Sequence, residues 1–174
     1  HLLITGPPGC GKTTLLMRLA HLFPDRSIAG FYTEEIRADG NRQGFSLKSL
    51  DGGEGVLSHV RFKKGPRVGR YGVDVPGFNA FLAEQDLTRS PASMVLIDEI
   101  GKMECLSGVF VELMRALFNS EKMVVATVAA RGSGFIQEVK ERKDCELVVI
   151  SPQTWEKMFH VLARRIRSYL KSDL

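Results

Sequence analysis

Continuous apolar runs alternate with amphipathic stretches through the second half of this chain. Residues 94–97 and 148–150 contain no polar position, a pattern typical of strands that are buried on both faces of a parallel sheet. The pattern predicts strands over 94–98, 122–127 and 145–150, with helices over 106–118, 135–142 and 154–170. In the last helix, i, i+3 and i+4 spacing predicts a core-facing side made of Trp155, Met158, Phe159, Leu162, Ile166 and Leu170.

The first half begins in the same way and is then interrupted by shorter strands. An apolar strand over 1–5 precedes a glycine-rich segment and a helical pattern over 14–20. After turn residues Asp25 and Ser27, Asp-Gly turn chemistry at 39–40 and 51–53 separates predicted strands over 27–37, 42–50 and 55–60. We expect a loop that ends in a strand over 63–74, and a helix over 76–87.

Together these elements predict a three-layer α/β fold: a mainly parallel sheet covered by helices, with an antiparallel β insertion after the first helix. A length of 174 residues suits one domain, over 1–174. No apolar stretch reaches the roughly 18 residues that a membrane span needs, and no signal-peptide pattern precedes the first strand, so we expect a cytoplasmic protein. Because the chain begins at His1 and not at Met, we expect that residues ahead of it were removed.

A phosphate-binding loop is the clearest chemical signal in the sequence. The segment 6–13 fits the pattern G-x-x-x-x-G-K-[ST] and stands between a predicted strand and a predicted helix, a context that disfavours a mere glycine-rich turn. Glycines let backbone N–H groups surround phosphate oxygens, while the helix N-terminus attracts their negative charge. The predicted nucleotide-binding residues are Gly6, Pro7, Pro8, Gly9, Cys10, Gly11, Lys12, Thr13 and Thr14.

Within this loop, Lys12 would place a positive charge on the β- and γ-phosphates, and Thr13 would offer its hydroxyl to Mg²⁺. The strand over 94–98 ends in the carboxylate pair Asp98 and Glu99, at the sheet edge where ligands bind in open α/β folds. We expect Asp98 to hold Mg²⁺ through water and Glu99 to accept a proton from an attacking water. Alone, such a pair also occurs where acidic residues cap a helix; the loop in the same chain favours the catalytic interpretation.

A further cation would stabilise the charge on the transferring phosphoryl group. Arg131 is the first candidate, because it follows the strand over 122–127 and lies next to Gly132 and Gly134, which would let the loop move over the site. Lys102, Arg37 and Arg70 are the alternatives. Thr127 ends the strand expected beside Asp98, so its hydroxyl could sense the γ-phosphate; the alternative is an ordinary β-branched strand residue.

Charge and cysteine content narrow the function classes. The net charge of +4 agrees with an anionic ligand such as a triphosphate, and the basic clusters at 61–67 and at Arg164, Arg165 and Arg167 match no nucleic-acid motif. Nucleic acid therefore stays a possible but less favoured partner. The three cysteines are widely spaced, which disfavours both a disulfide framework and a zinc site.

Several longer segments resemble the small THEP-type nucleoside-triphosphatases, a P-loop NTPase family whose animal counterpart is called cancer-related nucleoside-triphosphatase. The segments that carry the resemblance are 6–13, 30–37, 44–45, 68–74 and 96–104, of which Gly-Phe-Tyr-Thr-Glu-Glu and Asp-Glu-Ile-Gly-Lys-Met-Glu are the most specific. The resemblance implies a three-layer P-loop NTPase fold and Mg²⁺-dependent hydrolysis of ATP, GTP, CTP and UTP with loose base preference. Residues 129–134 depart from the family pattern, so the resemblance does not assign a role to Arg131.

Three functions follow, in order of preference. The first is hydrolysis of nucleoside triphosphates, because a carboxylate directly after Asp98 is suited to activating water. The second is a small nucleoside or nucleotide kinase, although only Arg131, Lys140 and Arg142 fall where a basic lid would lie. The third is a nucleic-acid-stimulated NTPase. The loop over 151–155 is the candidate for contact with the base, and a monomer is favoured while the oligomeric state stays open.

Overall fold

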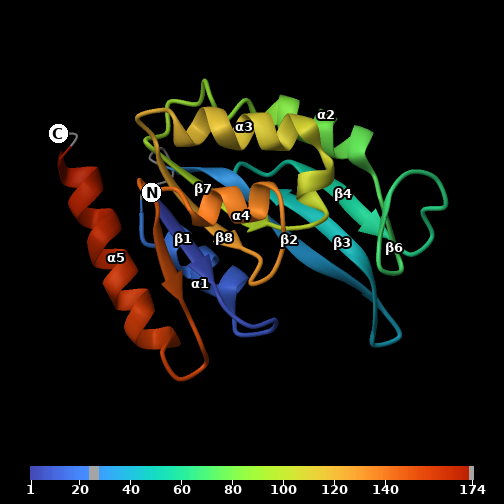
Figure 1. The fold of residues 1–174 in the computed structure, drawn as a ribbon, viewed down its shortest axis with the longest axis horizontal. Coiled ribbons are helices and arrows are strands. Elements are labelled where there is room, and N and C mark those ends of the chain that lie inside the picture. The colour runs from blue at the N-terminus through green and yellow to red at the C-terminus, as the bar shows by residue number, and fades with distance from the viewer. Residues whose placement is uncertain (24–27, 173–174) are drawn as a thin grey trace.

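One sheet organises the molecule. The computed structural model describes residues 1–23 and 28–172, so the predicted turn at Asp25 and Ser27 lies outside the described residues. Within them, nine strands follow the order β5-β6-β4-β3-β2-β7-β8-β1-β9 (Figure 1). The strands are β1 Leu2–Thr5, β2 Ile28–Ala38, β3 Asn41–Ser49, β4 Glu54–His59, β5 Arg67–Val68, β6 Tyr71–Val73, β7 Met94–Ile100, β8 Met123–Val128 and β9 Glu146–Val149.

The parallel part of the sheet contains the apolar runs of the sequence. Strand β1 pairs in parallel with β8 on one side and β9 on the other, β8 pairs with β7, and β7 pairs with the first residues of β2. All six residues of β8 are buried, as expected for a strand covered on both faces. This arrangement confirms the predicted α/β fold with a mainly parallel sheet.

The antiparallel insertion extends the same sheet. The second half of β2 leaves β7 and pairs with β3, and β4 and β6 add further antiparallel strands. Asp39 and Gly40 join β2 to β3 with φ angles of 50° and 75°. Positive φ at both central residues matches the twist of a hairpin, which explains why the Asp-Gly pair stands there.

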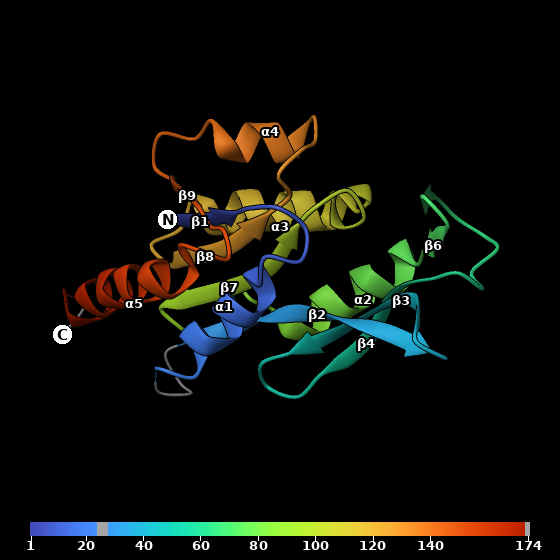
Figure 2. The same ribbon diagram turned by 90° about the horizontal axis from the view of Figure 1, so that it is seen from below.

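Helices cover both faces of the parallel strands (Figure 2). They are α1 Lys12–Ala20, α2 Val75–Gln85, α3 Gly108–Phe118, α4 Phe135–Lys140 and α5 Trp155–Ser172. One apolar cluster joins α1 and α5 to residues such as Leu2, Ile4 and Leu96, and the other joins α2, α3 and α4 to Leu3 and Ile97. Neighbouring residues of one strand thus enter opposite clusters, because successive side chains point to opposite faces.

All five helices that the structure describes differ by one or two residues from their predicted bounds, at one end or at both. The helix predicted from residue 106 begins at Gly108, because the Ser107 hydroxyl accepts a hydrogen bond of 2.9 Å from the Phe110 N–H and caps it; a 3-10 turn, Glu104–Leu106, precedes it. Helix α5 runs to Ser172. Of its predicted core residues, Phe159, Leu162 and Ile166 are buried, whereas Trp155, Met158 and Leu170 are partly buried against the same cluster.

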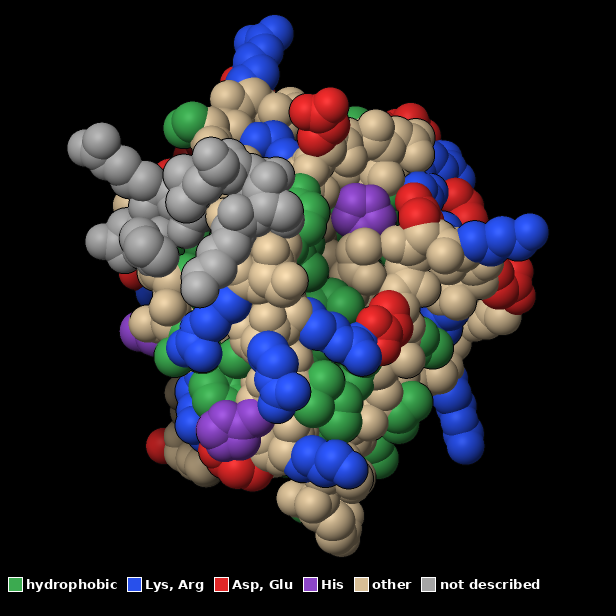
Figure 3. Space-filling view, turned by 90° about the vertical axis from the view of Figure 1, so that its left-hand side faces the viewer, with side chains coloured by type: hydrophobic (Ala, Val, Ile, Leu, Met, Phe, Trp, Pro, Cys, Tyr) green, Lys and Arg blue, Asp and Glu red, His purple; other side chains and the backbone are tan. Residues whose placement is uncertain are grey.

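The outer side of α5 is basic. Arg164, Arg165 and Arg167 are exposed, and Arg165 pairs with Glu146 of β9. Figure 3 shows lysine and arginine side chains gathered on this face of the molecule. Among the residues that the structure describes, no helix combines the length and the apolar character that a membrane span requires.

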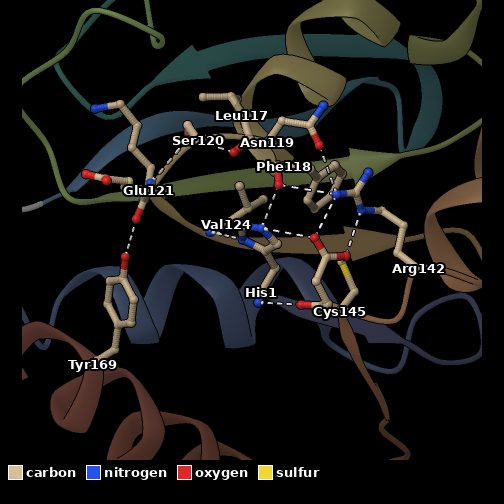
Figure 4. A network of polar contacts seen from close by, with 12 residues as sticks. His1, Leu117, Phe118, Asn119, Ser120, Glu121, Val124, Arg142, Cys145 and Tyr169 are labelled. Atoms are coloured by element: carbon tan, nitrogen blue, oxygen red, sulfur yellow. Dashed lines mark hydrogen bonds and ion pairs between the residues drawn. The ribbon is translucent and has the colours of Figure 1, made fainter.

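A polar network closes the amino end of β1 (Figure 4). The His1 ring accepts a hydrogen bond from the Val124 N–H at Nδ1, so its Nε2 donates to the Phe118 carbonyl, 3.0 Å away. The Arg142 guanidinium donates to the same carbonyl at 3.2 Å and pairs with Asp144. Arg142 is therefore held at the end of β1 that lies opposite the phosphate-binding loop.

Candidate nucleotide site

The loop between β1 and α1 adopts the geometry that its glycines allow. Gly9 and Gly11 have φ angles of 74° and 89°, a region that favours glycine, and Gly11 immediately precedes α1. The Trp155 Nε1 donates to the Gly11 carbonyl at 3.0 Å, and a Cβ on Gly11 would stand 2.9 Å from the same nitrogen. Residue 11 therefore needs glycine for both backbone shape and space, and α5 fixes the loop from the side.

Lys12 is the first residue of α1 and lies across the loop. Its Nζ donates to the Gly6 carbonyl at 3.1 Å and to the Pro7 carbonyl at 3.3 Å. The ammonium group thus stands over the cradle of backbone N–H groups. A phosphate bound in the cradle would meet this charge directly.

Asp98 joins three elements at the carboxyl edge of the sheet. The Thr13 hydroxyl of α1 donates to Asp98 Oδ2 at 2.7 Å, and the Thr127 hydroxyl of β8 donates to Oδ1 at 2.7 Å. Asp98 is only 2% exposed, and burial raises its pKa, while the hydrogen bonds from Thr127, Thr13 and the Thr33 backbone oppose this rise. The predicted proximity of Thr127 and Asp98 is confirmed. Because Thr127 is fully buried beneath Asp98, it acts on the site through this carboxylate.

Glu99 follows Asp98 in the chain and also lies close to the carboxyl group of Glu104. Burial, and next the charge of Asp98, raise the pKa of Glu99, whereas the charge of Lys12 opposes the rise. Glu104 is 5% exposed, and its Oε2 and the Glu99 Cδ lie 2.8 and 3.3 Å from the point where a Cβ on Gly101 would stand. Glycine at 101 therefore leaves room for two carboxyl groups to approach each other beneath the site.

A cavity of about 1000 Å³ opens over these groups. The phosphate-binding loop lines it together with Asp98, Glu99 and Arg131, so most of the predicted site residues meet in one place. Among the predicted loop residues, Cys10 is buried and does not line the cavity. The other lining residues come from the ends of β1 and β9, from β2 and β3, and from the segment after β8: Thr5, Val149, Thr33, Glu35, Arg42, Phe45, Ala129 and Ala130.

Several residues predicted for the outer part of the site lie away from this cavity. Lys102, Arg37 and Arg70 are not among the lining residues, and the segment 151–155 does not line the cavity either. Strands β2 and β3 supply one wall of the cavity, and this wall was not predicted. Its signal in the sequence is the alternation of Thr33 and Glu35, polar residues two apart on one strand face.

The donor atoms suit a hard divalent cation. Thr13 Oγ1 and the Asp98 carboxylate are oxygen ligands of the kind that Mg²⁺ prefers, and Mg²⁺ commonly keeps several waters and takes its other ligands from phosphate. No cluster of three or more His, Cys, Asp or Glu side chains that could hold a metal occurs among residues 1–23 and 28–172. Thr13 and Asp98 are thus the residues that could hold this cation.

Comparison with known proteins agrees with this geometry. The family model described as NTPase matches residues 1–163. Nucleoside-triphosphatase THEP1 of Thermotoga sp. (strain RQ2) is 40% identical over 172 residues, which cover 98% of this chain and 95% of that protein. The human protein named cancer-related nucleoside-triphosphatase is 33% identical over 169 residues, which cover 88% and 89% of the two chains.

Two solved structures are similar over almost the whole chain. The crystal structure of THEP1 from the hyperthermophile Aquifex aeolicus matches with a TM-score of 0.79 and 30% identity, over 92% of this chain and 95% of that one. The solution structure of the human cancer-related nucleoside triphosphatase matches with a TM-score of 0.77 and 30% identity, over 97% of each chain. With the phosphate-binding loop and the Asp98 network in place, the chain belongs to this NTPase family and is an enzyme of the nucleoside-triphosphatase class.

Proposed function

We propose that this protein hydrolyses nucleoside triphosphates to the diphosphate and phosphate, with Mg²⁺ and with loose preference for the base. The observation that carries the proposal is the convergence of Lys12, Asp98 and Glu99 on the cavity that the phosphate-binding loop lines. Relatives named nucleoside-triphosphatase support it. The proposed substrates are ATP, GTP, CTP and UTP.

The loop and Lys12 bind the triphosphate in this proposal. Backbone N–H groups between β1 and α1 contact phosphate oxygens, and the Lys12 ammonium group neutralises charge on the β- and γ-phosphates. The Thr13 hydroxyl and, through water, the Asp98 carboxylate hold Mg²⁺. When bound, Mg²⁺ neutralises charge that develops on the phosphate oxygens.

Glu99 accepts the proton of the attacking water. Burial and the neighbouring Asp98 raise the pKa of Glu99, which makes its carboxylate a stronger base than an exposed one. Thr127 keeps the Asp98 carboxylate turned toward Thr13, because it occupies the other carboxylate oxygen. Arg131 lines the cavity from the segment after β8 and is a candidate to stabilise charge on the transferring group.

Loose base preference follows from where the specific contacts lie. The polar side chains that line the cavity are suited to phosphate and metal, and the segment 151–155 adds none to the lining. We therefore expect turnover of the four triphosphates within about tenfold of each other, which corresponds to about 1.4 kcal/mol.

The kinase alternative receives less support from the side chains. Of the residues that would form a basic lid, Arg142 is tied to Phe118 and Asp144, and Lys140 donates to the Ala130 carbonyl at 2.9 Å. Arg131 alone of the three lines the cavity. Hydrolysis therefore remains the proposal.

Phosphate release from ATP, GTP, CTP and UTP tests it, with and without Mg²⁺, nucleoside acceptors and nucleic acid. We expect Mg²⁺-dependent release that acceptors and nucleic acid leave unchanged, and an increased Mg²⁺ requirement in Asp98→Asn. Transfer of phosphate to an acceptor would favour a kinase, and strong stimulation by RNA or DNA would favour the nucleic-acid-stimulated module. A thousandfold preference for one base would contradict loose recognition.

A further inference from the structure

Arg42 enters the nucleotide cavity from the antiparallel insertion. It lies on β3 and lines the same cavity as Lys12 and Glu99. Its guanidinium group pairs with Glu35 of β2, and its Cζ lies 5.3 Å from the centre of the Phe45 ring. Its Nε is buried and has no hydrogen-bond partner among the described residues. The side chain is thus held in place while one donor remains unused.

A β-bulge brings Arg42 to this wall. The register of β2 and β3 pairs Ile36 with Gly44 but Arg37 with Arg42, so Gln43 is an extra residue. Residues three apart on a regular strand point to opposite faces, yet Arg42 and Phe45 both line the cavity. The bulge therefore moves one arginine from the outer face of the hairpin to the cavity side.

The order of strands places this arginine beyond the carboxylates. The loop follows β1, and β8, β7 and β2 come next across the sheet, with Asp98 and Glu99 on β7. Arg42 therefore stands at the wall on the far side of Glu99 from the loop. In the proposed function the terminal phosphate lies beside Glu99, between the loop and that wall.

We propose that Arg42 contacts the terminal phosphate of the bound nucleotide and stabilises the charge on it during hydrolysis, while Glu35 positions the guanidinium group. This inference rests on the proposed function. As the water oxygen bonds to the γ-phosphorus, the bond to the bridging oxygen breaks, the diphosphate leaves with its electron pair, and the water proton passes to Glu99. A guanidinium group beside the γ-phosphate oxygens favours this charge distribution.

Arg37 provides a matched control within the same hairpin. It also pairs with Glu35, through an Nε to Oε2 hydrogen bond of 2.8 Å, and its other contact is the Gly40 carbonyl in the turn. It does not line the cavity. Replacing Arg37 therefore removes a partner of Glu35 without removing a cavity cation.

The experiment compares Arg42→Ala, Arg42→Lys and Arg37→Ala in steady-state ATP hydrolysis and in calorimetric binding of ADP alone or with aluminium fluoride, a mimic of the transferring group. For Arg42→Ala we expect kcat to fall by about 10²-fold or more. The affinity of this variant for ADP should stay within about threefold of that of the unchanged protein. The increase in affinity that aluminium fluoride gives to ADP in the unchanged protein should be lost. Arg42→Lys should recover part of kcat, and Arg37→Ala should resemble the unchanged protein.

Each other outcome overturns the inference. Equal kcat for Arg42→Ala and Arg37→Ala would show that cavity position does not matter. If Arg42→Ala lost both ADP affinity and thermal stability, and aluminium fluoride still increased its affinity for ADP, Arg42 would have a structural role only. If the unchanged protein releases no phosphate from any triphosphate with Mg²⁺, the proposed function itself fails; normal release with an unaffected Arg42→Ala variant rejects only this inference.

Discussion

The buried carboxyl of Glu104 should make folding stability depend strongly on pH. Glu104 begins the 3-10 turn after β7, is 5% exposed, and accepts hydrogen bonds from backbone N–H groups, including that of Gly101. Burial first, and the charges of Glu99 and Asp98 next, raise its pKa to about 8. The perturbation to test is Glu104→Gln, which keeps the shape of the side chain and cannot ionise.

The direction in which the free energy of unfolding changes with pH depends on how many protons the folded and unfolded states bind. In the unfolded chain this carboxyl titrates near its ordinary value of 4.5, whereas the folded protein keeps the proton up to about pH 8. The folded state therefore binds more protons between these values, and the free energy of unfolding decreases as pH rises through that window. At about 1.4 kcal/mol per pKa unit, the full loss for Glu104 is on the order of 5 kcal/mol. That is a large part of the free energy of unfolding of a small domain, which is typically about 5–15 kcal/mol.

Urea denaturation measures this quantity at a series of pH values from about 5 to 9, with a chelator and without nucleotide. The single tryptophan, Trp155, reports unfolding by fluorescence, because it packs between the loop and Phe159. Glu104→Gln should show a smaller decrease with pH and should exceed the unchanged protein in stability at the alkaline end. Glu84→Gln, at an exposed position on α2, is the control and should follow the unchanged protein.

The same pH slope in Glu104→Gln and in the unchanged protein would refute the reasoning. It would mean that the Glu104 carboxylate is stabilised in the folded state as well as in water. A Glu104→Gln variant that is less stable at every pH would instead indicate that the amide cannot satisfy the backbone groups near Gly101.

Three further predictions concern the proposed mechanism. Glu99→Gln should lower turnover by about 10² to 10⁴ while nucleotide affinity persists, because only the proton acceptor is lost; wild-type turnover would remove Glu99 from the mechanism. Lys12→Ala should abolish turnover and weaken triphosphate binding in a folded protein, and near-normal phosphate release would reject the site. Thr127→Val should leave one Asp98 oxygen without its hydrogen bond, so the free energy of unfolding measured in urea should fall by about 1–3 kcal/mol and the Mg²⁺ concentration needed for turnover should rise. If neither the free energy of unfolding nor the Mg²⁺ requirement changed, this hydrogen bond would be unimportant.

The parallel half of the fold and the centre of the site follow from local patterns. Apolar runs identify buried strands, and the loop pattern together with Asp98 identifies the carboxyl edge. The hydrogen bonds from Thr13 and Thr127 to Asp98 connect segments 85 and 29 residues apart, and each of these residues was recognised from its position relative to a strand. Local patterns suffice here because parallel strands place their carboxyl ends together.

Which arginine of the insertion lines the cavity could not be predicted, for a physical reason. Which side chain of a hairpin faces a cavity depends on register, and a shift of one residue reverses every face. The bulge at Gln43 makes this shift, and nothing in the neighbouring sequence distinguishes Arg42 from Arg37 or Arg70 as the arginine it selects. The burial of Glu104 escaped prediction for a similar reason, because it depends on how the segment after β7 folds back beneath Glu99.

The insertion also bears on the choice between water and a second substrate. A phosphate acceptor must approach the terminal phosphate in line with the leaving diphosphate, from the side away from the loop. Glu35 and Arg42 bound the cavity on that side. Burial alone would raise the pKa of Glu35, but hydrogen bonds from Arg42 and Arg37 together lower it, so the wall carries one carboxylate between two guanidinium groups. Arg42 is the arginine of this pair of strands that lines the cavity, and in the proposal it serves the terminal phosphate of the triphosphate. A nucleotide acceptor would bring further phosphate charges that need cations of their own, whereas water carries no charge and needs none, so a wall with one cavity arginine suits hydrolysis better than transfer to a nucleotide.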